Sequence, residues 1–244
     1  MCGFVGFYLK ETARLEEERY ELTLNKMSKV IDHRGPNDQG IFINKDKKLG
    51  LAFQRLSILD LNKNANQPML SKNKDWIIVY NGEIYNYQEL KKLISIQSGF
   101  WNTNTDTEIA LELISKYGFI KAIPKLNGMF AIAAYCFSTN TLWLARDKFG
   151  EKPLYYNYTN TEGLLFGSDI RSFFLYPNIK KSLDKEATAQ YFRYGYVPDP
   201  LCILESTHKL EPGSIIKYDQ INLIKKVKYW DSMKIYSNIQ QKKF

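Results

Sequence analysis

The second residue of the chain is a cysteine, and its position gives it a specific chemical option. Removal of Met1 would leave the Cys2 thiol and a free α-amine on one residue. An α-amine has an ordinary pKa of ~7.7–8.0 and a thiol one of ~8.5, so at neutral pH the amine can accept or relay the thiol proton. A nucleophile and its base would then be present without a histidine. A lone cysteine is also common as inert packing, and Cys2 alone does not decide between the two interpretations.

An Asn-Gly pair is the second feature that could take part in chemistry. The apolar stretch 76–80 (WIIVY) predicts a strand, and Asn81-Gly82 follows it directly. This dipeptide after a strand is typical of a tight turn. The same turn could also present hydrogen-bond donors to a ligand, so the pair has both a structural and a functional interpretation.

Two charged residues complete the candidate set. Thr105 followed by Glu108 predicts a capped helix start, which places Asp106 in the first helical turn. There Asp106 could simply complement the helix dipole. Arg55 lies near the end of a predicted strand, where it could be a surface charge.

The elements that must position these residues form a mixed pattern. Gly3–Leu9 predicts a buried strand, and an apolar stripe predicts a helix over 15–32 that ends before Gly35-Pro36. Further strands are predicted at 40–44, 49–57, 129–137, 142–145, 154–158, 164–167, 214–218 and 223–229, and helices at 87–97, 169–174 and 184–194. Many antiparallel strands with few helices indicate an α+β layered fold and not an alternating parallel sheet.

Composition excludes several classes of protein. The 244 residues are 44% apolar and 25% charged, which indicates a globular protein, and one large domain is the better interpretation. The net charge is +8, but the stretch 208–244 has eight Lys against three acids, so a basic tail is favoured over nucleic-acid binding. Three Cys and two His are too few for a disulfide framework or a zinc cluster. Without a signal peptide or a membrane-length apolar run, a cytoplasmic location with no membrane contact is expected.

A set of motifs runs in order along almost the whole chain, from Cys2 to about Trp230. The stretches that carry it, after the terminal CGFVG, are HRGPNDQG (33–40), QRLSILDL (54–61), QPM (67–69), NGEIYNYQEL (81–90), TDTE (105–108), LNGMFAIAAY (126–135), RDKFGEKPLYY (146–156) and FGSDIR (166–171). Together they resemble the glutaminase domain of glutamine-hydrolysing asparagine synthetases, in the class-II glutamine amidotransferase family. NGEIYN with HRGP separates this branch from the amidotransferases that make glucosamine 6-phosphate or phosphoribosylamine.

The resemblance implies a fold and a set of roles. It implies the N-terminal-nucleophile hydrolase fold, in which two antiparallel sheets are stacked between helical layers (αββα). Cys2 would attack the glutamine carboxamide, while the Asn81 side chain and the Gly82 N–H would stabilise the oxyanion. Arg55 would bind the α-carboxylate of glutamine and Asp106 its ammonium. The remaining implied site residues are Glu83 as a further ammonium acceptor, the backbone of Leu56, Ser57, Ile58 and Leu59 as pocket lining, and Arg34 as a supporting cation beside Cys2.

The chain departs from the family pattern at three positions and at its end. Phe53, Glu151 and Asp169 replace the usual residues, and none of them carries an implied catalytic role. No Ser-Gly-Gly-x-Asp-Ser loop, which opens the ATP-pyrophosphatase domain of these synthetases, is present. We therefore expect a glutaminase domain at 1–230 and a basic polar tail or linker at 231–244. Arg146, Asp147 and Lys152 are expected to brace the structure.

The expected reaction needs glutamine but no metal and no cofactor. ATP and Mg²⁺ belong to the synthetase domain, which would act in cis or in trans. A homodimer is compatible with the resemblance. Two alternatives stay open: amide transfer to another acceptor such as a sugar carboxylate, and a catalytically silent module that binds glutamine or docks a partner.

Overall fold

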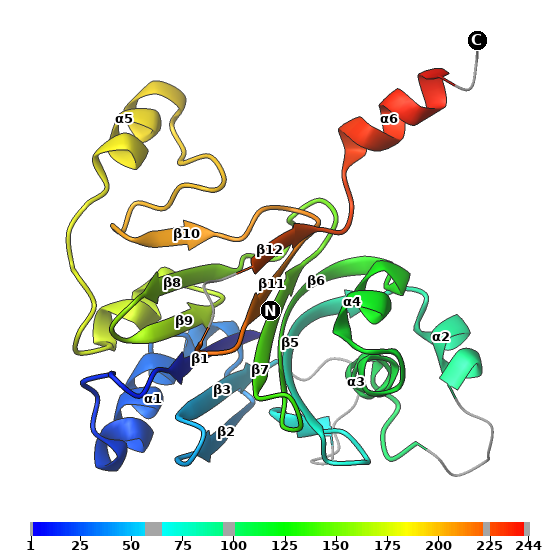
Figure 1. The fold of residues 1–244 in the computed structure, drawn as a ribbon, viewed down its shortest axis with the longest axis horizontal. Coiled ribbons are helices and arrows are strands. Elements are labelled where there is room, and N and C mark those ends of the chain that lie inside the picture. Colours follow the sequence, from blue (N-terminus) through cyan, green and yellow to red (C-terminus); the bar gives the residue numbers. More distant parts are fainter. Residues whose placement is uncertain (1, 57–64, 95–100, 222–224, 242–244) are drawn as a thin grey trace.

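Two antiparallel β-sheets form the centre of the computed structural model, which describes residues 2–56, 65–94, 101–221 and 225–241. Within these residues each sheet has six strands (Figure 1). The first sheet has the order β10-β8-β9-β1-β3-β2, and its strands are β1 (Gly3–Leu9), β2 (Asp38–Asn44), β3 (Leu49–Arg55), β8 (Tyr155–Thr159), β9 (Gly163–Gly167) and β10 (Thr207–Lys209). The second has the order β12-β11-β7-β6-β5-β4, and its strands are β4 (Met69–Leu70), β5 (Trp76–Ile84), β6 (Gly128–Cys136), β7 (Thr141–Arg146), β11 (Ser214–Tyr218) and β12 (Lys225–Lys228).

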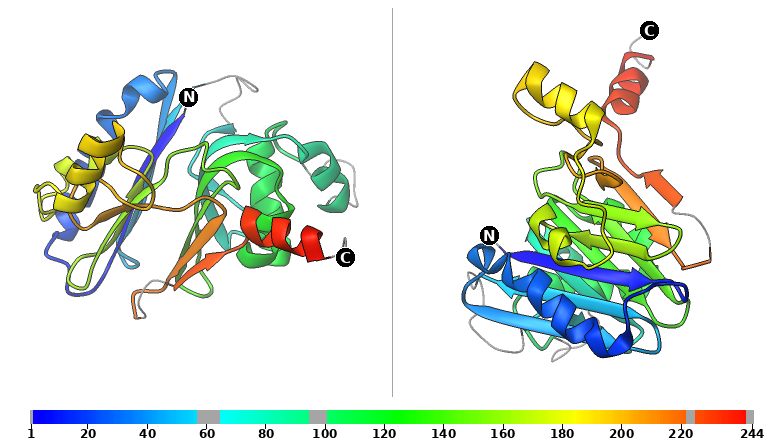
Figure 2. Two further views of the ribbon diagram at one scale, coloured as in Figure 1. Left: turned by 90° about the horizontal axis from the view of Figure 1, so that it is seen from above. Right: turned by 90° about the vertical axis from the view of Figure 1, so that its left-hand side faces the viewer.

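Helices cover the outer face of each sheet (Figure 2). The helices of the described residues are α1 (Tyr20–Lys29), α2 (Tyr87–Ile94), α3 (Asp106–Tyr117), α4 (Phe119–Ala122), α5 (Lys185–Tyr194) and α6 (Ser232–Gln241), with short 3₁₀ segments at Glu17–Arg19, Asp32–Arg34, Ile123–Lys125 and Ile170–Leu175. The helix α1 packs on the first sheet, and α2, α3 and α4 lie on the second. The predicted α+β class and the αββα layering are confirmed.

Strand alternation explains the layers. In β1, Val5 and Phe7 point toward α1, whereas Phe4 and Tyr8 point into the space between the sheets. A third apolar layer lies between the second sheet and α3. Three apolar layers thus hold the two sheets and their helices together, and central strands such as β1, β3 and β7 are largely buried on both faces.

The first helix is shorter than its pattern predicts. The apolar stripe predicts a helix over 15–32, but α1 comprises Tyr20–Lys29 and has a 3₁₀ segment on each side. Leu15 is buried in the same apolar layer as Leu24 without being helical. The apolar spacing over 15–32 therefore predicted correctly that this segment has a buried apolar face, but it predicted a helix that is too long.

The predicted turn at Asn81-Gly82 is wrong. β5 continues through both residues to Ile84, paired along its whole length with β6, and the chain turns at 85–86. The glycine is needed for close packing, because a Cβ atom on Gly82 would lie 2.2 Å from the Met129 carbonyl oxygen. Long-range strand pairing outweighs the local turn preference of the dipeptide.

The segment from Ser232 onward, predicted as a solvated tail, contains the helix α6. Met233 and Tyr236 on this helix are 70% and 60% exposed. The helix α5 is also poorly covered: of its residues only Ala187 is buried, and Phe192 is 83% exposed. Both helices project from the body of the molecule (Figures 1 and 2). No helix of the described part of the chain is long and apolar enough to cross a membrane.

Candidate active site

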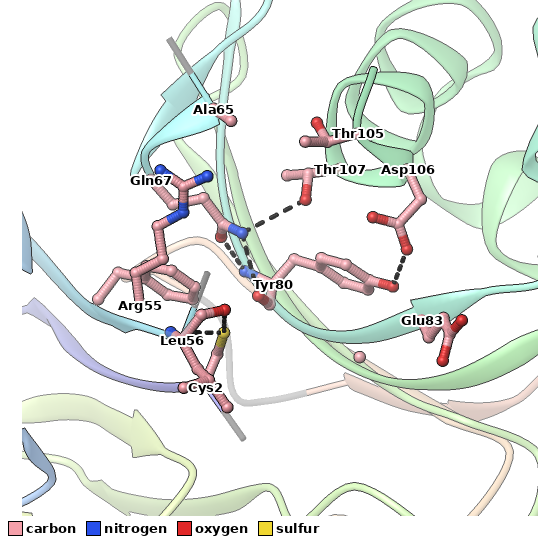
Figure 3. Close-up of a pocket in the computed structure, with 12 residues that line it drawn as sticks. Cys2, Arg55, Leu56, Ala65, Gln67, Tyr80, Glu83, Thr105, Asp106 and Thr107 are labelled. Carbon is pink, nitrogen blue, oxygen red and sulfur yellow. Dashed lines mark hydrogen bonds between the residues drawn. The ribbon is translucent and has the colours of Figure 1, made fainter. Parts of the chain in front are cut away.

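A cavity of about 150 Å³ lies where the two sheets and α3 meet (Figure 3). Five segments that are separate in the sequence contribute to it: the residue before β1, the end of β3, the stretch just before β4, the end of β5 and the start of α3. The lining residues are Cys2, Phe53, Arg55, Leu56, Ala65, Gln67, Tyr80, Gly82, Glu83, Thr105, Asp106 and Thr107. The tertiary structure therefore brings together Cys2, Arg55, Gly82, Glu83 and Asp106, all of which the sequence singled out.

Cys2 precedes β1 and is partly exposed to the cavity. The Leu56 N–H donates to its sulfur at 3.3 Å, and the Leu56 carbonyl oxygen lies 3.6 Å from the same atom. An N–H group that donates to sulfur is placed to stabilise a thiolate. Leu56 thus connects the end of β3 to the predicted nucleophile.

Arg34 lies beside Cys2 and contacts its backbone. Its Nε donates to the Cys2 carbonyl oxygen at 3.2 Å. Its Nη2 is buried and has no hydrogen-bond partner among the described residues. The arrangement places a cation near the start of β1 without a direct bond to the sulfur.

The main chain of Gly82 faces the open edge of β5. Phe130 lies opposite Gly82 in the β5–β6 register, but both its N–H and its carbonyl are bonded to Asp147. Gly82 and Phe130 therefore form a non-hydrogen-bonded pair, in which the Gly82 N–H points away from β6. Because Gly82 lines the cavity, this N–H is available to a ligand there.

Both neighbours on that edge are already bonded. The Tyr80 N–H donates to Gln67 Oε1 at 2.6 Å, and the Ile84 N–H donates to Asp106 Oδ2 at 2.9 Å. The strand β4 pairs with β5 only as far as Ile78. The Gln67 side chain therefore takes the place of β4 as the partner of the β5 main chain at Tyr80. The Gly82 N–H lies between the bonded N–H groups of Tyr80 and Ile84.

The Asn81 side chain faces the opposite way from that of Tyr80. By alternation it shares its face with Ile77 and Val79, which belong to the apolar layer between the sheets, and Cys2 packs against the same layer. Asn81 is 2% exposed, and its Nδ2 has no partner among the described residues. It does not line the cavity. Burial of an amide donor without a hydrogen-bond partner costs free energy, which is consistent with a bound ligand that accepts this hydrogen bond.

Asp106 is the first residue of α3. The Thr105 side chain caps the helix by accepting from the Glu108 N–H, as predicted. The Tyr80 hydroxyl donates to Asp106 Oδ2 at 2.7 Å, so this oxygen accepts from both Tyr80 and Ile84. Burial raises the pKa of Asp106 above its usual value, and hydrogen bonds from the Tyr80 hydroxyl, the Ile84 N–H and the Thr107 N–H partly oppose the rise.

Arg55 ends β3 and is 8% exposed. Its Nη1 donates to Asn66 Oδ1, and Asn66 Nδ2 donates in turn to Asp38. This chain of bonds holds the guanidinium at the cavity wall. Glu83 is exposed and lines the same cavity. Ser57, Ile58 and Leu59, predicted to line the pocket, lie outside the described residues.

Several polar residues of this region are not predicted as site residues from the sequence. Gln67 lies in the QPM motif, Tyr80 in a predicted strand and Thr107 in a predicted helix cap. The QPM stretch gave a signal for Gln67, and the position of Tyr80 directly before Asn81 gave another. Their partners lie 13 to 40 residues away, so spacing could not reveal these bonds.

The Arg146–Asp147 segment lies apart from this cavity. The Arg146 guanidinium donates to the Lys152, Gly150 and Leu210 carbonyls and to Asp199. Asp147 is 0% exposed and accepts from backbone N–H groups on both oxygens. These contacts are those of a structural brace.

Comparison with known proteins assigns the chain to a family. Residues 1–230 match the model of the glutamine amidotransferase domain. A Methanocaldococcus jannaschii protein named as a candidate glutamine-hydrolysing asparagine synthetase is 36% identical over 100% of this chain and 49% of its own length. Asparagine synthetase 1 of Bacillus subtilis is 38% identical over 88% of this chain and 33% of its own length. The chain thus spans half or less of the length of these relatives.

A solved structure supports the same fold. The glutamine phosphoribosylpyrophosphate amidotransferase of Bacillus subtilis superposes with a TM-score of 0.63 at 16% identity, over 94% of this chain and 49% of that chain. At this identity the likeness concerns the fold alone. The family match, the identity to the synthetases and the layered fold agree. The chain belongs to the class-II glutamine amidotransferase domain family and is similar over most of its length to asparagine synthetases.

Proposed function

We propose that this chain hydrolyses glutamine to glutamate and ammonia, with Cys2 as the nucleophile. One observation carries the proposal: a thiol, a free-edge N–H, a guanidinium and a carboxylate from four separate segments line one cavity. A substrate with an amide at one end and a zwitterion at the other matches that set. The proposal requires that Met1 is removed.

The reaction begins at the Cys2 sulfur. The free α-amine of Cys2 takes the thiol proton, and the sulfur attacks the carboxamide carbon of glutamine. The C=O electron pair moves to oxygen, where the Gly82 N–H and the Asn81 Nδ2 donate to the negative charge. Donors of this kind contribute ~2.7–4 kcal/mol each to lowering a barrier.

Two later steps return the enzyme to its starting state. The amine donates the proton to the leaving nitrogen, the C–N bond breaks, and ammonia leaves behind a γ-glutamyl thioester on Cys2. Water, deprotonated by the same amine, attacks the thioester carbon. The C–S bond breaks, glutamate is released and the sulfur regains its proton.

Recognition of glutamine uses the other end of the cavity. The Arg55 guanidinium binds the α-carboxylate, and the Asp106 carboxylate accepts from the α-ammonium. Glu83 is a further acceptor for that ammonium, and the Leu56 backbone lines the pocket. Arg34 supports the start of β1 and adds positive charge beside the nucleophile.

We further propose that the ammonia passes to aspartate to form asparagine. The relatives named as asparagine synthetases support this acceptor. Residues 1–230 would form the glutaminase domain and 231–244 the linker. An ATP-pyrophosphatase domain, in cis or in trans, would activate aspartate with ATP and Mg²⁺. The exposed apolar side chains on α5 and α6 are consistent with contact to such a domain.

The glutaminase proposal is tested with the purified chain. Intact mass establishes whether Met1 is lost, and a coupled glutamate assay measures turnover. A diazoketone analogue of glutamine should add one label, on Cys2. Met1-free protein that neither releases ammonia nor takes up the label would refute the proposal. The acceptor is tested separately, by amino-acid analysis after incubation with aspartate, ATP, Mg²⁺ and the synthetase domain.

A further inference from the structure

We propose that Tyr80 is a specificity-determining positioning residue, whose hydroxyl holds one oxygen of Asp106 so that the other oxygen is presented to the α-ammonium of the substrate. The inference deepens the proposed function and rests on it. Tyr80 acts through Asp106 and not on the reacting atoms.

The first step is the direction of the hydrogen bonds on Asp106. Tyr80 donates to Oδ2 at 2.7 Å and the Ile84 N–H donates to the same oxygen at 2.9 Å. In Figure 3 the other carboxylate oxygen points away from the Tyr80 hydroxyl, toward the space that Gln67 and Thr107 also face. The Thr107 N–H also donates to this carboxylate. The two donors on Oδ2 give the carboxylate a defined orientation, in which its other oxygen is directed away from Tyr80.

The second step is the rigidity of Tyr80 itself. Tyr80 is 3% exposed, and Gln67 binds its main chain twice: Oε1 accepts from the Tyr80 N–H at 2.6 Å, and Nε2 donates to the Tyr80 carbonyl at 3.2 Å. The same Nε2 lies 3.4 Å from Thr107 Oγ1, in the residue after Asp106. One amide therefore ties the strand that carries Tyr80 to the helix turn that carries Asp106.

The third step is the protonation state of the donor. Burial raises the pKa of Tyr80 well above its usual value, and the nearby Asp106 carboxylate adds to the rise. Tyr80 therefore remains a neutral donor at every pH at which the enzyme could work. Among the described residues, the charged and titratable groups that line the cavity together with Asp106 are Tyr80 and Glu83 on β5, Arg55 on β3 and Cys2 before β1.

The chain contains a matched control. Tyr176 is also buried, and its hydroxyl donates to Glu162 Oε2 at 2.7 Å. Glu162 is part of the outer layer on the first sheet and also accepts from Arg14 and Asn178. Tyr80→Phe and Tyr176→Phe each remove one tyrosine–carboxylate bond of the same length, but only the first removes it from the cavity.

Kinetics with two substrates test the inference. For Tyr80→Phe we expect KM for glutamine to rise about 3- to 10-fold with kcat nearly unchanged, because the bond orients a charged acceptor. The acid limb of kcat/KM should move to higher pH, because loss of the donor raises the pKa of Asp106 further. Glutaramate, which lacks the α-amine, should show the same kcat/KM in both enzymes to within about twofold. Tyr176→Phe should change none of these quantities.

Two outcomes would overturn the inference. One is an equal loss of kcat for glutamine and glutaramate with KM unchanged, which would indicate a structural role only. The other is an unmoved acid limb in Tyr80→Phe.

Binding separates this inference from the proposed hydrolysis. Calorimetry with glutamine compares Cys2→Ala with Cys2→Ala/Tyr80→Phe, neither of which needs turnover. The double variant should bind about 3- to 10-fold more weakly, and equal affinity would refute the role of Tyr80. If the two variants differ in affinity as expected but the wild-type chain releases no ammonia, the hydrolysis alone would be refuted. Absence of glutamine binding would refute both.

Discussion

The Asp106 cavity and the Asp147 brace are two buried polar regions built on the same sheet, and they are satisfied in different ways. Both oxygens of Asp147 accept backbone N–H groups, from Phe149 and Glu151 on Oδ1 and from Phe130 and Lys152 on Oδ2. On Asp106 the Tyr80 hydroxyl and the Ile84 N–H both donate to Oδ2, and the Thr107 N–H also donates to this carboxylate.

This difference distinguishes a carboxylate that stabilises the fold from one that is able to bind a ligand. A carboxylate whose two oxygens are occupied by backbone donors fixes a loop and has little capacity left for a ligand. Arg146 adds to the brace by bonding three carbonyls and a carboxylate. In the cavity, by contrast, Tyr80 and Asp106 bond to each other, while the Gly82 N–H on the same edge of β5 is not bonded to β6. The Asn81 amide is a separate case, because it is buried on the opposite face of β5 and its Nδ2 has no partner in the described part of the chain.

Removal of the thiol should have the largest effect on the cavity. Cys2→Ala should lower the rate of glutamine hydrolysis by about 10⁴-fold or more, because no other nucleophile replaces the sulfur. The free energy of unfolding should change little, since Cys2 is only partly buried. Coupled glutamate assays and urea denaturation measure the two quantities. Retained turnover would show that the cavity does not work through Cys2.

The brace should respond in the opposite way. Asp147→Ala leaves four backbone donors without an acceptor and should lower the free energy of unfolding by about 3–5 kcal/mol. Urea denaturation gives this value. In the fraction that remains folded, KM for glutamine should stay near that of the wild type. A stable protein with a selectively raised KM would contradict the assignment of Asp147 to structure.

The buried amide is expected to act on the barrier. Asn81→Ala should lower kcat by about 10²–10³-fold while changing KM less, because an oxyanion donor acts in the transition state. Steady-state kinetics with glutamine decide the matter. If KM rose and kcat were unchanged, Asn81 would belong with the groups that bind the substrate.

The cavity carboxylate should act on binding. Asp106→Asn should raise KM for glutamine by about 10- to 100-fold with a smaller change in kcat, because it removes the charge that pairs with the ammonium. Glutaramate should be hydrolysed equally well by both enzymes. Equal losses with both substrates would place Asp106 outside recognition of the α-amine.

The smallest effect concerns pH and stability. Burial raises the pKa of Asp106 in the folded state, so the native protein holds this proton to higher pH than the unfolded chain. The free energy of unfolding should therefore fall slightly as pH rises from the usual Asp range through the raised pKa. Asp106→Asn should flatten this part of the profile in urea denaturation at several pH values. A profile that is unchanged by the substitution would contradict the raised pKa.

Over the same range activity should change in the reverse direction. Asp106 must be ionised to pair with the ammonium, so kcat/KM should rise with pH as stability falls. The two profiles together distinguish a binding carboxylate from a structural one.

Local features of the fold were predictable. The buried strand at Gly3–Leu9, the strand that begins at Trp76 and the Thr105 cap of α3 all follow from residues within a few positions of each other. The apolar patterning and the capping preference that predict these elements act over the same short range. The residues Cys2, Arg55, Gly82, Glu83 and Asp106 were also predicted, on the basis of a motif order, and they line one cavity.

Other features depended on contacts that no local pattern contains. Asn81-Gly82 has the sequence of a turn, but pairing with β6 keeps it extended and turns the Gly82 N–H toward the cavity. Gln67 meets Tyr80 across 13 residues, and Tyr80 meets Asp106 across 26. The sequence by itself determined which elements form and which chemical groups they carry. Only the tertiary structure decided which oxygen of Asp106 is bonded to Tyr80 and which N–H of β5 faces the cavity, because those directions follow from the register between strands and from side-chain bonds that close after the sheets have packed.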